Sequence, residues 1–179
     1  MTDVSDLAIG ELAAYIAEHL RSKGIETVLV GGACISIYSA NEYSSYDLDF
    51  IITGLSTRQK VRAALAEINF TEENRYFVNP QTPFFIEFPS GPLAIGDEPP
   101  SEISTLNFKT GNLRLLSPTD CVKDRLAAFY HWKDQQSLEQ AVLIARDHAI
   151  DFKEVRRWSE NEGFAEVFEN KVAGLFPEF

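Results

Sequence analysis

The segment 47–53, Asp-Leu-Asp-Phe-Ile-Ile-Thr, constrains the fold more than any other part of this sequence. Its apolar run predicts a β-strand inside a sheet, yet the strand carries two carboxylates. Alternate side chains of a strand point to the same face, so Asp47 and Asp49 share a face, roughly 7 Å apart at the backbone. A solvent-exposed strand face would tolerate them, but Leu48 and the other apolar neighbours favour a central strand. Like charges so close together are costly there unless a cation compensates them. The pair therefore indicates a site for one or two divalent metal ions, which bind carboxylate oxygens.

A glycine pair, Gly31-Gly32, follows a β-branched run at residues 27–30 that predicts a short strand. Glycine adopts positive φ and lets the backbone approach a ligand closely. Residues 33–40 are expected to form a short helix, whose first amides would point at an anion such as a triphosphate. Most glycine pairs are only turns, so the weight of this pair comes from its short distance in sequence to Asp47. A phosphate resting on the glycines can be bridged by a metal to the acids.

A third carboxylate, Glu87, interrupts the apolar segment 84–88, which predicts another strand. An acid in such a segment needs a partner. A salt bridge or an exposed edge position would provide one. Combined with the acid pair, Glu87 can instead position a metal or accept the proton of an attacking hydroxyl. Asp97 and Glu98 are alternatives for the third acid, but they lie in a proline-rich stretch.

Basic and aromatic residues in the last third of the chain offer two further hypotheses. Lys123, Arg125 and Lys133 can hold the oxygens of a triphosphate. Ordinary ion pairing on the surface of helices explains each of them equally well. Trp132 and Trp158 are expected in the core rather than as platforms for a nucleotide base.

The whole pattern predicts an α/β (α+β) chain, with a mixed α/β part at residues 1–116 and a helical part at residues 117–179. Helical spacing or start signals cover 6–21, 56–68, 117–131, 134–148, a helix from 151 and the last dozen residues. Further strands are expected at 76–78, 106–109 and 113–116. Helix starts are marked by Ser56 with Gln59, by Ser117-Pro118 and by Asp151. Six of the eight prolines lie between residues 80 and 100, which predicts turns and loops there. No flexible linker joins the two parts, so they are expected to pack together.

Charge and cysteine content exclude several classes of protein. The chain has 16 Lys and Arg against 27 Asp and Glu, a formal net charge of -11. Broad binding of nucleic acid usually requires basic residues that neutralise phosphates, so this balance argues against it. A small nucleotide held through a metal remains compatible, because the metal brings its own positive charge. Cys34 and Cys121 form no paired motif, which argues against a disulfide framework and a cysteine zinc site. With neither a signal peptide nor an apolar run of membrane-spanning length, a cytoplasmic protein is expected.

The order of the motifs resembles the DNA polymerase β-like nucleotidyltransferase superfamily. Gly31-Gly32, a short helix, Ser45-x-Asp47-Leu48-Asp49-Phe50 and a later Glu87 are similar to its signature, and the resemblance covers residues 26–145. The segments 115–120 and 123–127, followed by Lys133-Asp134, look like the subgroup of AbiEii-like abortive-infection toxins and related bacterial proteins.

The resemblance implies a nucleotidyltransferase-like mixed sheet flanked by helices, with a C-terminal helical part. It implies transfer of a nucleoside monophosphate from a nucleoside triphosphate, with Mg²⁺ or Mn²⁺, to a hydroxyl of an acceptor. By this analogy Asp47, Asp49 and Glu87 are the catalytic, metal-binding residues. The analogy also implies that Gly31, Gly32 and Ser45 bind the phosphates, although Ser45 can equally well end a loop.

The sequence also departs from its relatives. Tyr43 stands where many of them have Arg, and Ser137 stands where an acid often follows the Lys-Asp pair. The acceptor can be a small molecule, a protein or RNA, and the acidic charge favours the first two. The alternative function is a catalytically silent protein of this fold that binds a nucleotide or a partner protein, as in a toxin–antitoxin pair. The presence of all three acids favours activity, because uncompensated acids at one site cost stability. A plain α/β binding domain would require the acids and the glycine pair to coincide by chance.

Overall fold

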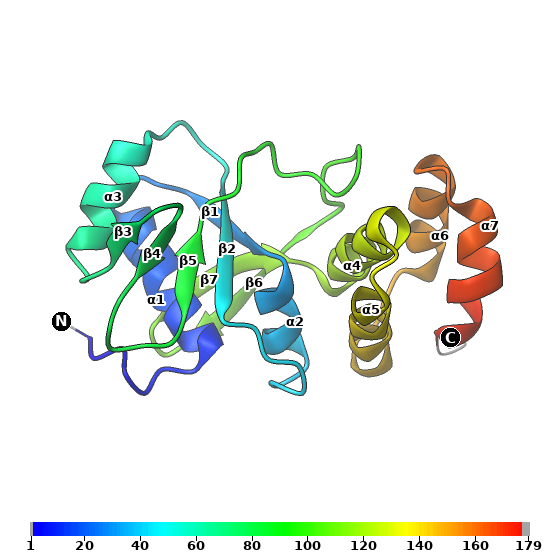
Figure 1. Ribbon diagram of the computed structural model, residues 1–179, viewed down its shortest axis with the longest axis horizontal. Helices are drawn as coiled ribbons and strands as arrows, with labels where there is room; N and C mark the ends of the chain where they lie inside the picture. Colours follow the sequence, from blue (N-terminus) through cyan, green and yellow to red (C-terminus); the bar gives the residue numbers. More distant parts are fainter. Residues whose placement is uncertain (1, 177–179) are drawn as a thin grey trace.

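The computed structural model describes residues 2–176, and it shows a mixed α/β architecture in which helices flank a sheet (Figure 1). The sheet has seven strands in the order β3-β4-β5-β2-β1-β7-β6. They are β1 (Thr27–Val30), β2 (Asp47–Ile52), β3 (Thr71–Glu73), β4 (Tyr76–Val78), β5 (Phe85–Glu87), β6 (Ile103–Phe108) and β7 (Gly111–Leu116). The pairs β2–β5 and β1–β7 are parallel, and the other four are antiparallel. The expected mixed sheet is confirmed, and the strand that carries the acid pair lies at its centre.

The helices agree with the predicted ones to within a few residues, except at the C-terminus. They are α1 (Ile9–Ser22), α2 (Gly32–Tyr38), α3 (Arg58–Ala66), α4 (Pro118–Trp132), α5 (Gln135–Asp147), α6 (Phe152–Asn161) and α7 (Ala165–Val167). A π-helical turn (Phe168–Val172) and a 3₁₀ turn (Ala173–Leu175) follow α7. The helix expected over the last dozen residues is thus a series of short turns, and residues 177–179 lie outside the described part.

Helix starts obey the capping chemistry that the sequence indicates, with one correction. Ser117 accepts a hydrogen bond from the Asp120 amide, and Asp151 accepts one from the amide three residues later. Ser56 was expected to cap the helix α3, but the structure gives this role to Thr57, whose hydroxyl accepts from the Lys60 amide. The two hydroxyl residues are adjacent in sequence, so local pattern alone does not separate them.

The two faces of the central strand β2 have different surroundings. Leu48 and Phe50 are fully buried in the hydrophobic core to which α1 and α3 contribute. Asp47 and Asp49 point to the opposite face and remain partly exposed. The alternation of a half-buried strand therefore keeps the acid pair out of the core while the strand itself is central.

The helical C-terminal part contacts the sheet domain through α2 and the loop before β6. His148 Nε2 lies 2.7 Å from the carbonyl of Tyr38, the last residue of α2. From α6, the Trp158 indole donates to the Ile95 carbonyl at 3.0 Å. Within residues 2–176, no helix combines the length and the apolar character needed to cross a membrane.

Two features differ from the sequence expectation. The strand β3 was missed, because Thr71–Glu73 is polar and only its pairing with β4 makes it a strand. The turn between the two strands contains Asn74 at φ +58°, a conformation that asparagine tolerates. The expectation that both tryptophans lie in the core is right for Trp158, which is fully buried, and wrong for Trp132, which is 81% exposed. The predicted helix ended at residue 131, whereas Trp132 is the last residue of α4, and its side chain points into solvent there.

Candidate metal centre

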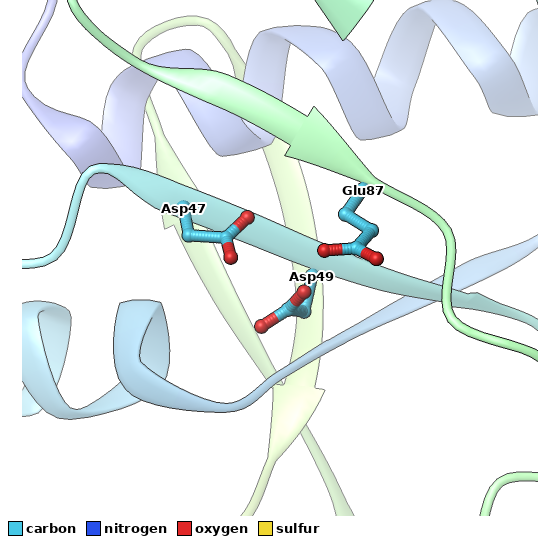
Figure 2. A group of neighbouring side chains, drawn as sticks. All are labelled: Asp47, Asp49 and Glu87. Carbon is cyan, nitrogen blue, oxygen red and sulfur yellow. The ribbon is translucent and has the colours of Figure 1, made fainter. Parts of the chain in front are cut away.

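Three carboxylates converge on one face of the sheet. Asp47 and Asp49 come from β2, and Glu87 comes from the end of β5, directly opposite Asp49 in the parallel register. Each offers an oxygen, and these oxygens all lie within 4.8 Å of one another (Figure 2). Partial exposure of all three side chains leaves the group open to solvent. The sequence prediction that these residues form one cluster therefore agrees with the geometry.

The clustering makes ionisation of the acids unfavourable. The pKa of Asp49 is raised to about 7, chiefly by burial and in addition by the nearby charges of Asp47 and Glu87. Burial also raises the pKa of Asp47, with Glu87 adding to the effect and the Arg75 guanidinium opposing it. Such repulsion is relieved when a cation binds between the carboxylates.

One atom of the cluster lacks a partner of its own. Asp47 Oδ1 is buried and has no hydrogen bond to any of residues 2–176. A buried carboxylate oxygen without a partner is costly. Three converging carboxylates with an unsatisfied oxygen are the donor set that hard divalent cations such as Mg²⁺ prefer. The residues present therefore fit a metal ion.

The glycine turn lies against the acid pair. Val30, the last residue of β1, pairs with Asp49, and the next residue, Gly31, has φ +70°. A Cβ on Gly31 would lie 2.7 Å from Asp49 Oδ2. Only glycine fits here, because both the backbone conformation and the space exclude a side chain. The structure thus brings Gly31 and the acids together, as the sequence indicated.

Comparisons with known proteins bear on the fold that carries these residues. No family model and no curated protein matches the sequence, but solved structures resemble the structure of this chain. An antigenic nucleotidyltransferase-like protein from Paracoccidioides brasiliensis has a TM-score of 0.64 at 14% identity, over 93% of this chain and 91% of that chain. The antibiotic-resistance factor ANT(2'')-Ia has a TM-score of 0.54 at 12% identity, over 97% of this chain and 96% of that one. This chain has a nucleotidyltransferase-like fold. The fold expected from the sequence is therefore confirmed, whereas identities this low say nothing about the reaction.

Around the glycine turn of the nucleotidyltransferase-like fold, Ser45 has a local role. Its amide donates to Ser36 Oγ at 2.8 Å, and its hydroxyl lies 3.3 Å from both the amide nitrogen and the carbonyl oxygen of Asp47. Ser45 Oγ would also be 3.3 Å from a Cβ on Gly32, and the ring of Tyr43 would be 3.6 Å from it. Ser45 thus lies beside Gly32 and fixes the start of β2.

The basic residues of the helical part are placed very differently from one another. Lys123 is 1% exposed and forms ion pairs with Asp120 at 2.7 Å and Glu154 at 3.1 Å. Its ammonium group also donates to Ser101 at 2.8 Å. With its ammonium enclosed by these partners, Lys123 contributes to the packing of α4 against α6, and the geometry gives no support to its assignment as a phosphate ligand.

The Lys133-Asp134 pair forms the turn between α4 and α5. Lys133 adopts φ +54° at the end of α4, and Asp134 caps α5. The buried Ser137 donates to Asp134 at 2.6 Å. The residue that departs from the relatives' pattern is therefore part of this cap.

Arg125 is the member of the predicted basic cluster whose charge reaches the metal centre. Its guanidinium group pairs with the Asp124 carboxylate and lies 3.4 Å from the Gln140 side chain. It also lowers the pKa of Asp49, whereas the Asp124 carboxylate raises it. Such coupling places the middle of α4 within electrostatic reach of the acids. Arg125 was one member of the predicted basic cluster, and the structure singles it out.

Sequence reasoning missed a second arginine at the site. Arg75, at the turn between β3 and β4, has its Nε 3.3 Å from Glu87 Oε1. The only signal in the sequence was the neighbouring Asn74, since the pairing depends on the register of three strands. The fallback acid Glu98 lies elsewhere, with its carboxylate held by Arg157 and Asn161, so that its pKa is lowered to about 2.

Proposed function

We propose that this chain is a metal-dependent nucleotidyltransferase that moves a nucleoside monophosphate from a nucleoside triphosphate to a hydroxyl of an acceptor. One observation supports the proposal above all others. Carboxylates from two neighbouring strands of a nucleotidyltransferase-like fold converge within 4.8 Å beside a glycine turn that a Cβ would block.

Asp47, Asp49 and Glu87 are the residues that would hold Mg²⁺ or Mn²⁺. Such an ion, when bound, would neutralise the charge of the phosphates and of the three acids. The unpaired Oδ1 of Asp47 and the raised pKa of Asp49 both support this role. A bound cation would give the oxygen of Asp47 a partner and would stabilise the ionised form of Asp49.

The residues of the chain divide the reaction between them. Gly31 gives the triphosphate room beside Asp49, and Gly32 with Ser45 forms the adjoining surface. Glu87 accepts the proton of the acceptor hydroxyl as that oxygen attacks the α-phosphorus. A new acceptor O–P bond forms while the bond from the α-phosphorus to the bridging oxygen breaks. Pyrophosphate leaves with that electron pair, and Arg125 is the basic residue placed to stabilise it.

The finer assignments are part of the same proposal. Resemblance to the AbiEii-like subgroup rests on sequence motifs alone, and one of them, Lys133-Asp134, is explained by the turn that it forms. The acceptor is a small molecule or a protein rather than RNA, because a net charge of -11 opposes binding of RNA.

Incubation with each α-labelled nucleoside triphosphate and Mg²⁺ tests the activity directly. With pooled small-molecule acceptors present, we expect the wild type to transfer the label to an acceptor and to release unlabelled pyrophosphate. Neither product should form with the double variant Asp47→Asn/Asp49→Asn. Asn keeps the shape of each side chain and removes the charge that a metal needs.

Thermal shift separates the proposal from its alternative. A ligand at 100 times its Kd stabilises the folded state by about 2.7 kcal/mol, so nucleotide with Mg²⁺ should raise the Tm of the wild type only. Stabilisation without any pyrophosphate release would favour a silent nucleotide-binding protein. Equal stabilisation of the wild type and the double variant would refute the metal centre.

A further inference from the structure

The metal centre has two unlike sides in the plane of the sheet. On one side, β1 ends at Val30 beside Asp49 and continues into the glycine turn. On the other side, β5 places Glu87 beside Asp49, and β4 then places Tyr76 beside Glu87. The acid pair therefore lies between the glycine turn and Glu87.

Resting on the proposed function, this order of strands identifies which side of the metal centre takes the triphosphate and which side takes the acceptor. In phosphoryl transfer the attacking and leaving oxygens are roughly in line on opposite sides of the phosphorus. A triphosphate on the glycine turn has its leaving pyrophosphate on the β1 side. The acceptor then approaches over β5 and β4, where Glu87 can receive its proton.

The surface of the sheet on the acceptor side is open and partly aromatic. Tyr76, Val78 and Phe85 share the face of Glu87 and are each partly exposed, whereas Phe77 and Ile86 on the opposite face are fully buried. The rings of Tyr76 and Phe85 meet edge to face with centroids 4.9 Å apart. This surface can support the flat or apolar part of a small molecule.

One cation stands at the edge of this surface. The Arg75 guanidinium lies over the Tyr76 ring at 4.8 Å, donates to its hydroxyl at 2.5 Å, and is 3.3 Å from Glu87. The side chain is nevertheless 69% exposed. Arginine has five N–H donors in a planar fork, so these contacts leave donors that face solvent. Engagement of Glu87 by a metal would weaken its pairing with Arg75 further.

We infer that Arg75 binds an anionic group of the acceptor, so that the natural acceptor is a small hydroxyl compound that carries a phosphate or a carboxylate. A bidentate pair between a guanidinium and such a group is stronger than a neutral hydrogen bond and also fixes orientation. Anchoring the acceptor at Arg75 places the rest of the molecule over Tyr76 and its hydroxyl beside Glu87. A net charge of -11 makes the chain as a whole attract cationic ligands. The positive charge of Arg75 opposes that attraction at this place and favours an anionic group instead.

Matched pairs of acceptor probes test this inference. The chain is loaded with Mg²⁺ and with a non-hydrolysable analogue of the nucleoside triphosphate that stabilises it most. Affinities for glucose and glucose 6-phosphate, and for glycerol and glycerol 3-phosphate, are measured by saturation-transfer NMR, with glucosamine as the cationic probe. We expect the phosphorylated member of each pair to bind at least about tenfold more tightly, as for one charge-assisted contact.

Variants separate the guanidinium from the metal as the source of that preference. Arg75→Gln should abolish the preference and Arg75→Lys should keep part of it. Arg62→Gln is the matched control, since Arg62 is 60% exposed and pairs with Glu72 at 3.6 Å. As a second readout, Arg75→Gln should bind Mn²⁺ several-fold more tightly in the absence of nucleotide, because a competing cation is gone.

The outcomes distinguish this inference from the proposed function. Equal affinity within each pair, tightest binding of glucosamine, or an anion preference that survives in Arg75→Gln would overturn the inference alone. A chain that binds neither Mn²⁺ nor nucleotide would refute the proposed function, and the acceptor assignment with it.

Discussion

Replacing Asp49 with Asn should stabilise the metal-free protein at neutral and alkaline pH. The pKa of Asp49 is raised from 3.8 to about 7 in the folded state, chiefly by burial. A difference of this size corresponds to about 4 kcal/mol between the two ionisation states. The amide keeps part of the burial cost and the face is open to water, so we expect the variant to gain about 1 to 3 kcal/mol at pH 8.

The sign of the pH dependence follows from proton binding. Between pH 4 and 7 the folded state binds more protons at Asp49 than the unfolded state, so the stability of the wild type falls as the pH rises through this window. Above about pH 7 the carboxylate is ionised in both states and the penalty is constant. The advantage of the variant should therefore be small near pH 4 and full by pH 8.

Urea unfolding in a chelating buffer at pH 4, 6 and 8 measures this advantage. Asp97→Asn serves as the control, because Asp97 is an exposed acid of the proline-rich loop outside the carboxylate cluster. Addition of Mg²⁺ should stabilise the wild type and the control and leave Asp49→Asn unchanged. A variant less stable than the wild type at pH 8, or an advantage that does not grow with pH, would refute the idea that the crowded acids are kept for a cation.

Four further substitutions test other parts of the structure. Gly31→Ala forces a Cβ to within 2.7 Å of Asp49 Oδ2 at positive φ, so it should cost more than about 1 kcal/mol and remove the Mg²⁺-dependent rise in Tm. Lys123→Met leaves the buried Asp120 without its cation and should cost about 3 to 5 kcal/mol in urea unfolding; a neutral result would show that the pair is dispensable. Trp158→Ala should cost about 3 to 5 kcal/mol, whereas Trp132→Ala should change stability by less than about 0.5 kcal/mol. Acrylamide should quench the fluorescence of the Trp158→Ala variant more strongly than that of the Trp132→Ala variant, because the remaining tryptophan of the former is exposed.

Local chemistry explains the parts of the fold that could be predicted. The starts of α4 and α6 depend on Ser117 and Asp151, whose side chains bind amides three residues away, and both signals are visible in the sequence. The alternation in β2 likewise places Asp47 and Asp49 on one face without reference to the rest of the chain. Strand β3 has no such signal, because its polar residues become a strand only through pairing with β4.

The same distinction applies to the candidate site. The acid pair and Gly31 lie on adjoining elements, so spacing was enough to associate them. Lys123 and Arg125 are two positions apart on α4, yet the first is enclosed by Asp120 and Glu154 whereas the charge of the second lowers the pKa of Asp49. Helical spacing places these two residues on different faces, but it does not say which face meets the sheet.

The acceptor side of the site is the clearest case of information that no single segment contains. Arg75 reaches Glu87 because β3 and β4 form a hairpin, β4 pairs with β5 so that Tyr76 lies beside Glu87, and β5 pairs with β2. A slip of one residue in β4 would turn Tyr76 to the buried face and remove the support on which the guanidinium lies. The proposed metal-binding half of the site is thus encoded in two short motifs, whereas the proposed acceptor half depends on register across four strands. A substitution that disturbs that register should therefore alter acceptor affinity while Mn²⁺ binding by the β2 acids persists.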